Sequence, residues 1–203
     1  MKKFFTLLCI AFCATSLFAN VVTGTCGDNL QWAYDTDTHA LTITGSGDMY
    51  WSGVRPWAQV AGEITSVSLP DGLTSIKEYA FDACSSLSSV TIPNSVTTIR
   101  GWAFQSCSSL TSVTIGNSVT SIGTSAFSDC SSLTSVTIGN SVTSIGYQAF
   151  SDCSALTSIT IPNSVTSIDS EAFHNTPWYN NLPDGIVYIN NVLYKYKGCL
   201  ILK

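Results

Sequence analysis

Four cysteines recur every 23 residues, and this row of thiols is the feature of the chain that most directly suggests metal or redox chemistry. A structural zinc site needs four ligands around one ion, with Zn–S bonds of about 2.3 Å. If the intervening segments stack as coils about 4.8 Å apart, the sulfurs form a row of about 14 Å and cannot converge on one metal. We therefore interpret them as buried free thiols that pack as small apolar side chains. The row consists of Cys84, Cys107, Cys130 and Cys153.

Disulfide bonds between neighbouring thiols of this row are an alternative that the sequence leaves open. A spacing of about 5 Å lies within the Cα separation that such bonds allow. Stacked side chains that point the same way nevertheless suit a disulfide poorly. Cys26 and Cys199 lie near opposite ends of the chain, so we do not expect them to pair with each other.

Two aspartates and two histidines are the other residues with catalytic potential. Asp129 and Asp152 share one position of the 23-residue pattern, and carboxylates about 5 Å apart occur in retaining glycosidases. No apolar pocket is evident that would raise either pKa for acid catalysis. Solvated surface carboxylates are the simplest interpretation, and weak calcium binding is an alternative. A nucleophile needs an oriented histidine, but His39 and His174 lie in opposite halves of the chain, so we expect no enzyme, cofactor or metal.

The cysteine row and the two aspartates belong to a 23-residue repeat that fills residues 64–178. The third unit reads LTSVTIGNSVTSIGTSAFSDCSS and the fourth reads LTSVTIGNSVTSIGYQAFSDCSA. Self-similarity at such a period is typical of a solenoid, in which each repeat forms one coil. Five units begin at Ile64, Leu87, Leu110, Leu133 and Leu156.

The apolar positions within a unit change their period partway along it. In the third unit, residues 110–115 have the spacing of a strand with alternating inward and outward side chains. Gly116, Asn117 and Ser118 predict a turn, and residues 119–122 predict a second short extended segment. Apolar residues at 122, 126, 127 and 130 fit one face of a helical turn. We predict a β-rich leucine-rich-repeat solenoid, with a parallel strand ladder, short helical turns and β caps at both ends.

A single unit cannot be stable alone, so the repeats must stack. About eight buried side chains contribute roughly 1.5–3 kcal/mol each, whereas ordering the backbone costs about 1–2 kcal/mol for every residue. Packing between neighbouring coils must supply the difference. Identical residues then form columns along the stack. Besides the cysteines, the predicted structural column consists of Phe81, Phe104, Phe127, Phe150 and Phe173.

The segments on either side of the repeats have separate expected roles. Residues 1–19 combine Lys2 and Lys3 with an apolar run, which predicts a cleaved signal peptide. Residues 20–63 predict an N-terminal β cap, and residues 179–203 predict a C-terminal cap hairpin and a tail that looks truncated. We expect the aromatic residues of the N-terminal cap to cover the first repeat, with a glycan-binding platform as the alternative. They are Trp32, Tyr34, Tyr50, Trp51 and Trp57.

The repeat closely resembles the BspA-like leucine-rich-repeat family of bacterial surface proteins. The resemblance rests on the unit LTSVTIPNSVTSI followed by AF and C, and on the flanking segments GTCGDNLQWAYD and TPWYNNLPDGIVYINNVLYKYKG. It implies a curved parallel-β solenoid, extracellular display and adhesive protein–protein binding. The chain shows no recognisable cell-wall sorting motif.

Composition limits the classes of partner. The chain has 10% charged residues and a net charge of −5, and the lack of a basic stripe argues against nucleic acid and anionic membrane surfaces. No later segment is apolar enough to span a bilayer. We expect a secreted or cell-surface protein whose partner is an extracellular protein, or a glycan. The sequence does not specify the oligomeric state.

Two sets of residues are the candidate binding residues. The first is a row of outward hydroxyls on the strand face, although threonine also simply favours exposed strand positions. It comprises Ser68, Thr91, Thr114, Thr137 and Thr160. The second is a set of aromatic residues where the repeats differ most, namely Tyr79, Trp102 and Tyr147. A structural spacer or assembly unit is the main alternative function, and an ice-binding threonine array is a more remote one.

Overall fold

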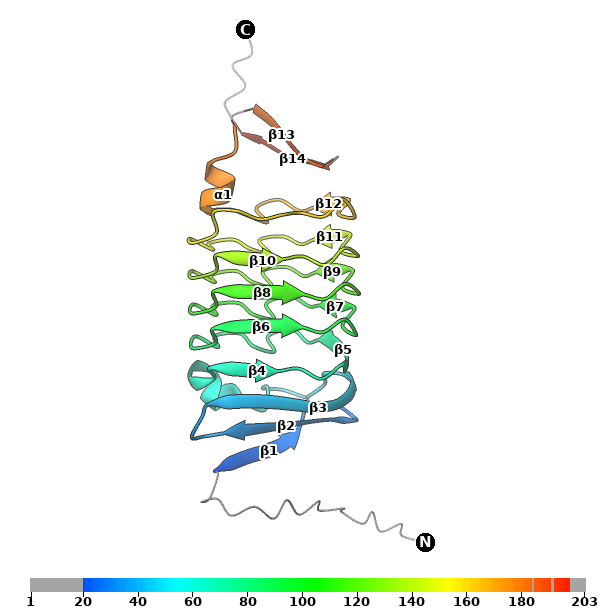
Figure 1. Ribbon diagram of the computed structural model, residues 1–203, viewed down its shortest axis with the longest axis vertical. Coiled ribbons are helices and arrows are strands. Elements are labelled where there is room, and N and C mark those ends of the chain that lie inside the picture. Colours follow the sequence, from blue (N-terminus) through cyan, green and yellow to red (C-terminus); the bar gives the residue numbers. More distant parts are fainter. Residues whose placement is uncertain (1–19, 184, 191, 198–203) are drawn as a thin grey trace.

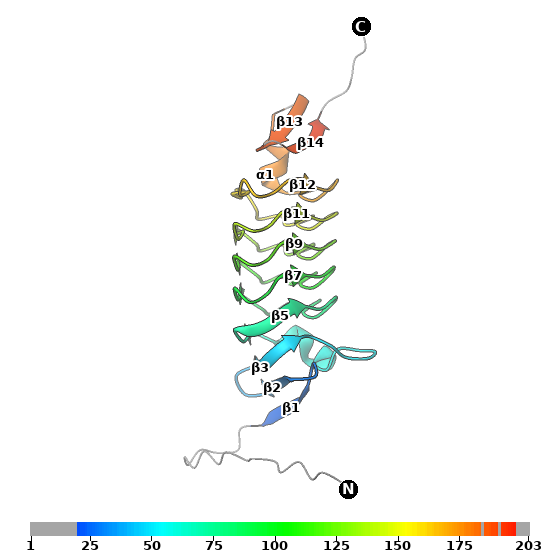
Figure 2. The same ribbon diagram turned by 90° about the vertical axis from the view of Figure 1, so that its right-hand side faces the viewer.

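The protein is a stack of coils that rises as a nearly straight column (Figures 1 and 2). The computed structural model describes residues 20–183, 185–190 and 192–197. The predicted signal peptide, the tail from residue 198 and Cys199 lie outside these described residues. Within them, no helix has the length and apolar character that crossing a membrane requires.

The N-terminal segment forms an antiparallel sheet that becomes the first turn of the solenoid. Its strands are β1 (Val21–Thr25), β2 (Leu30–Asp35) and β3 (Ala40–Asp48). Strand β3 then pairs in parallel with β4 (Ser66–Ser68) and, further along, with β5 (Gly72–Ile76). It therefore makes both of the pairings that a repeat makes, although its sequence lacks the repeat pattern. The 3-10 helix η1 (Ala58–Glu63) lies between this sheet and the first repeat.

Two parallel ladders form two sides of the column. The first contains β6 (Ser89–Ile92), β8 (Ser112–Ile115) and β10 (Ser135–Thr137), and a bridge between Thr137 and Thr160 extends it by one coil. The second runs from β5 through β7 (Thr98–Ile99), β9 (Ser121–Ile122), β11 (Ser144–Ile145) and β12 (Ser167–Ile168). Each residue pairs with its equivalent 23 positions later, as Val90 does with Val113.

The third side consists of consecutive turns in place of the expected helical turns. We call it the turn side. In the third repeat, φ is 52° at Ser125 and 59° at Asp129, values that interrupt any helix. The N–H groups of Ser125, Phe127 and Asp129 donate to carbonyl oxygens of the next coil at 2.8, 2.8 and 2.9 Å. Every backbone hydrogen bond between described coils on this side runs from an N–H of one coil to a carbonyl oxygen of the next coil along the chain. The turn side comprises residues 78–84, 101–107, 124–130, 147–153 and 170–176.

The core is a set of side-chain columns along the axis of the stack. Successive phenylalanine rings of the repeats are nearly parallel, with centroids 5.0–5.4 Å apart, and all five are fully buried. Phe104 and Phe127 differ by only 2° in ring plane. Identical residues at one repeat position therefore stack directly, which is why the coils stabilise one another.

Different groups cover the two ends of the turn side. At the N-terminal end, Trp57 stacks on Phe81 and donates through Nε1 to Ala80 O at 2.7 Å. At the other end, α1 (Pro177–Asn180) is followed by the hairpin of β13 (Gly185–Ile189) and β14 (Val192–Lys197). The hydroxyl of Tyr194 accepts a hydrogen bond from the backbone N–H of Phe173 at 3.0 Å.

Candidate functional site

The first strand ladder presents two columns of small hydroxyl side chains, which we call the hydroxyl face. Serine and threonine alternate along each strand with buried apolar residues, as Ser89 and Thr91 do with Val90 and Ile92. All members are exposed except Ser112, which is partly buried. The threonine column was predicted from the sequence, whereas the serine column two residues earlier was not, although the alternation of a strand places both on one side. The face comprises Ser66, Ser89, Ser112, Ser135 and Ser158, with Ser68, Thr91, Thr114, Thr137 and Thr160.

The hydroxyls of this face differ from those elsewhere on the column because the fold does not use them. Along the second ladder, the hydroxyls of Thr97, Thr120 and Thr143 donate to carbonyl oxygens of the preceding coil at 3.1–3.2 Å. A third column of threonines also bonds within the fold. The hydroxyl of Thr111, for example, donates to Ser88 O at 3.0 Å. In the part of the chain that the structure describes, no protein group forms a hydrogen bond with the side chain of Thr114. The same is true of the rest of the hydroxyl face, so these groups are available to a ligand.

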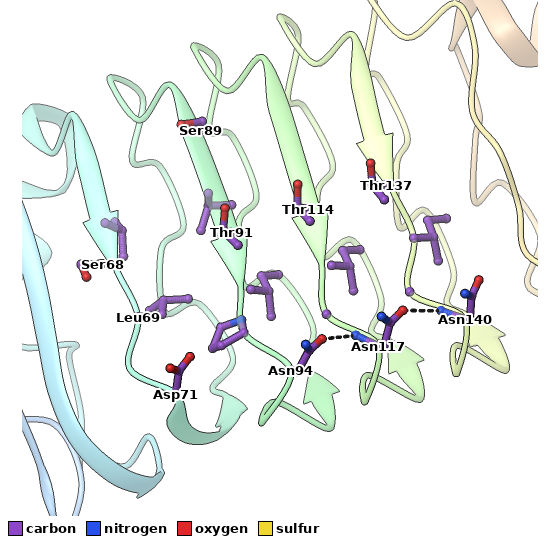
Figure 3. Close-up of a pocket in the computed structure, with 18 of the residues that line it drawn as sticks. Ser68, Leu69, Asp71, Ser89, Thr91, Asn94, Thr114, Asn117, Thr137 and Asn140 are labelled. Carbon is purple, nitrogen blue, oxygen red and sulfur yellow. Dashed lines mark hydrogen bonds between the residues drawn. The ribbon is translucent and has the colours of Figure 1, made fainter.

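A shallow groove of about 790 Å³ follows the hydroxyl face along four coils (Figure 3). One wall is a column of amides at the turn after each strand. The backbone N–H of Asn117 donates to Asn94 Oδ1 at 2.7 Å, and that of Asn140 donates to Asn117 Oδ1 at 3.1 Å. These bonds fix the asparagine side chains at the edge of the groove. Asp71 is the one charged residue in the lining. From its sequence position, Asn117 was predicted only as part of a turn.

The three aromatic candidates lie apart from the groove. Tyr79 and Trp102 occupy one column of the turn side and stack face to face, with centroids 5.1 Å apart and ring planes 7° apart. Tyr147 belongs to the adjacent column and donates from its hydroxyl to Glu171 Oε2 at 3.0 Å. This hydrogen bond to a carboxylate is the main cause that raises the pKa of Tyr147. The two predicted sets of binding residues therefore form separate surfaces.

The cysteine column consists of buried free thiols in the structure. The thiols of Cys107, Cys130 and Cys153 each approach a phenylalanine carbonyl oxygen at 3.1–3.2 Å. Desolvation raises the pKa of Cys84, and hydrogen bonds with the neighbouring thiols raise that of Cys130 well above the ordinary value. Cys84 and Cys130 therefore stay protonated and lack the thiolate that metal binding or nucleophilic attack requires.

The histidines and aspartates occupy unrelated places. The Nδ1 atom of His39 lies 2.8 Å from the hydroxyl of Tyr34 in the N-terminal sheet, whereas His174 lies in the last repeat. Hydrogen bonds from Ser151 and Asn175 lower the pKa of Asp152, which opposes a role as a general acid. Among the described residues, no group of three or more His, Cys, Asp or Glu side chains is arranged to hold a metal ion.

The family model for the BspA type leucine rich repeat region matches residues 59–180 in six copies, one more than the five units counted from the sequence. No curated protein matches the chain significantly. A leucine-rich-repeat protein from Bacteroides ovatus is 28% identical, with a TM-score of 0.53, over 72% of this chain and 37% of that protein. A leucine-rich-repeat protein from T. pallidum is also 28% identical, with a TM-score of 0.54, over 74% of this chain and 66% of that protein. This chain thus spans less than two thirds of either neighbour. With its stacked 23-residue coils and the family match over more than half of its length, the chain belongs to the BspA-type leucine-rich-repeat family.

Proposed function

We propose that this chain is a secreted or cell-surface adhesion protein that binds another protein through the hydroxyl face. The observation that carries the proposal is the contrast between threonine columns. Two of them use their hydroxyls inside the fold, whereas the column of Thr91, Thr114 and Thr137 leaves its hydroxyls unpaired beside a groove. Hydroxyls and amides that both donate and accept hydrogen bonds suit the main chain and polar side chains of a protein ligand.

The physical properties of the groove favour a protein over the other partner classes. It lacks lysine and arginine in its lining, so it offers nothing to neutralise phosphates. It also lacks aromatic residues, which would provide a stacking surface for bases or sugar rings. The ladder beneath it is rigid, so its side chains lose little entropy on binding. Each coil offers similar weak contacts, and affinity therefore depends on how many coils the partner touches.

Absence of catalysis is part of the proposal. The described thiols are buried, and the two histidines lie at opposite ends of the described column. A serine of the hydroxyl face has no base within the groove to activate it, because the lining contains no histidine. Incubation with ester, peptide and glycoside substrates is expected to give no turnover above that of heat-unfolded protein.

The binding proposal is tested with two matched triple variants. In the first, Thr91, Thr114 and Thr137 are changed to valine, which removes three free hydroxyls but preserves shape and strand preference. In the control, Thr97, Thr120 and Thr143 are changed to valine on the other ladder. Each protein is assayed against extracellular matrix proteins and intact partner cells. The first variant should bind at least about tenfold more weakly than the control, because each hydrogen bond is worth about 0.5–1.5 kcal/mol. Equal binding by both variants would exclude the hydroxyl face as the site.

Secretion is tested separately, by expressing the full chain and a chain without residues 1–19 in bacteria. Only the full chain is expected to be exported and to lose residues 1–19. Mass spectrometry of the exported protein gives its first residue. Retention of both chains in the cytoplasm would refute the extracellular part of the proposal without affecting the binding part.

A further inference from the structure

The outer edge of β1 is a free strand edge at the N-terminal end of the column (Figure 1). Strand β1 pairs with β2 on one side, and none of the described strands pairs with its other side. Proteins usually protect such edges with lysine, proline or a bulge. Strand β1 has the sequence VVTGT and contains none of these protections. Its residues Val21 and Val22 are 46% and 51% exposed.

The hydrogen bonds of the sheet establish which residues of β1 face outward. Thr36 N–H donates to Asn20 O at 3.1 Å, and Cys26 N–H donates to Leu30 O at 3.0 Å. In an antiparallel pair, hydrogen-bonded residues alternate with residues whose N–H and C=O point the other way. Even-numbered residues of this segment therefore bond to β2. The backbone N–H and C=O groups of Val21, Thr23 and Thr25 point away from the sheet.

We propose that β1 pairs antiparallel with β1 of a second copy of this chain, with Thr23 facing Thr23 of the partner subunit across a two-fold axis. Three outward residues centred on Thr23 make the edge self-complementary. Val21 then faces Thr25 of the partner subunit, and each of the three facing pairs exchanges two backbone hydrogen bonds. This interface is independent of the hydroxyl face and goes beyond the proposed binding function.

The side chains of β1 fit this register. Val22 faces Gly24 of the partner subunit, so one position of the pair has a side chain and the other has none. Within one chain, the indole of Trp32 already covers Gly24, since a Cβ there would lie 2.7 Å from Trp32 Nε1. In the dimer, Val22 of one copy would lie beside the indole that covers Gly24 of the partner subunit, and Val22 would become less exposed to solvent. On the opposite face, the register places the two Thr23 side chains together, which is a favourable cross-strand pair.

The small size of the interface predicts weak association. A pair of five-residue strands buries less than the roughly 1,200 Å² of a stable complex. The dimer should therefore dissociate on dilution. Display of many copies on one surface would raise the local concentration and favour pairing. Pairing through β1 would then join two columns at their N-terminal ends and leave their hydroxyl faces unobstructed.

The test is sedimentation of the purified full chain over a wide concentration range, after mass spectrometry has identified its first residue. A monomer–dimer equilibrium is expected for the parent chain. Thr23→Pro removes an outward N–H from each copy and should weaken the dimer at least about tenfold, with an unchanged circular dichroism spectrum. Thr23→Val retains the N–H and should dimerise like the parent.

A cysteine pair provides a test that does not depend on tolerance of proline. Residues that face each other in a hydrogen-bonded antiparallel pair have Cα atoms about 5.5 Å apart, which permits a disulfide. Thr23→Cys should therefore give covalent dimers under mild oxidation, beyond those of the parent chain. Thr42→Cys is the control, because Thr42 is exposed on the inner strand β3. A parent chain that stays monomeric, a dimer that survives Thr23→Pro, or equal cross-linking at both positions would overturn the proposal.

Discussion

Arg55 is expected to be the residue whose loss most weakens the N-terminal end of the column. Its guanidinium donates through Nη1 to Tyr79 O at 3.0 Å and through Nη2 to Asp82 O. Its Nη1 atom also lies 3.7 Å from Asp82 Oδ2. The carbonyl of Asp82 lies in the first repeat and has no preceding coil to bond with, whereas that of Tyr79 also accepts from Asp82 N–H at 3.4 Å. The change Arg55→Met removes the donors while keeping most of the apolar stem, so the effect measured is the loss of these hydrogen bonds.

The expected loss of stability follows from the burial of these groups. A hydrogen bond from a charged donor contributes about 1.5–3 kcal/mol, and the side chain of Arg55 is only 12% exposed. The ion pair adds less, because the side chain of Asp82 is 29% exposed and solvent screens it. We expect Arg55→Met to lower the free energy of unfolding by about 2–4 kcal/mol. Urea denaturation followed by tryptophan fluorescence measures this loss.

Arg100 provides the matched control for this prediction. Arg100 is exposed, and its side chain forms no direct hydrogen bond or ion pair with another described residue. Arg100→Met should change the stability by less than about 0.5 kcal/mol. Native-state hydrogen exchange of Arg55→Met should also show faster opening of the first repeat than of the third. A loss for Arg55→Met no larger than that for Arg100→Met would refute the view that the first carbonyls need a donor.

Three further predictions concern the core and the thiols. Trp57→Phe leaves the carbonyl of Ala80 without its donor and should cost about 1–3 kcal/mol in urea denaturation, whereas a neutral result would mean that water replaces the indole. Phe127→Ala opens the centre of the aromatic column and should cost about 3–5 kcal/mol in the same assay, and a loss below about 1 kcal/mol would contradict a shared core. Burial raises the pKa of Cys26 from 9.0 to about 11, so the folded chain keeps a proton that the unfolded chain loses. The contribution of this thiol to stability should therefore be constant below a pH of about 9, so the measured stability should fall as the pH rises from 9 toward 11, and a rise over that interval would contradict the burial of this thiol.

The stacking of like residues was predictable because it follows from sequence identity at a fixed interval. Phe104 and Phe127 occupy the same repeat position, and no arrangement other than direct stacking satisfies every coil at once. The BspA-like resemblance and the parallel ladder of the predicted fold are confirmed by the family match and the structure. The curvature implied by the resemblance is not evident in the nearly straight column.

The turn side was not predictable from the apolar spacing. Apolar residues at steps of four, one and three fit a helix, but they fit consecutive turns equally well. The decisive feature is a positive φ at Ser125 and Asp129, positions where no glycine signals it. Backbone bonds to the next coil stabilise this conformation, and those bonds exist only once the coils have stacked. The role of β3 was missed for a similar reason, since its pairing with two later strands leaves no repeat pattern in its sequence.

The position of the candidate site was predictable from the sequence, but the absence of hydrogen bonds to its hydroxyls was not. Thr91 lies in a short strand and Thr97 directly precedes one. Both are exposed, and the sequence offers no reason to distinguish their hydroxyls. The difference arises because the hydroxyl of Thr97 reaches a carbonyl of the preceding coil, whereas that of Thr91 points over a groove. Tyr79 and Trp102 stack on each other on another side of the column, and their contribution to partner binding stays a prediction.

The shared direction of the backbone bonds on the turn side gives that side of the column an electrical polarity. Peptide dipoles that point the same way add up, as they do in a helix. On this side, carbonyl oxygens without a partner in another coil make the N-terminal end negative, and N–H groups without such a partner make the C-terminal end positive. The cationic Arg55 at one end and the phenol oxygen of Tyr194 at the other match these signs. Inserting another 23-residue unit in the middle would lengthen the column without altering either end. Exchanging the two caps would instead place the cationic Arg55 at the positive end and the phenol oxygen of Tyr194 at the negative end.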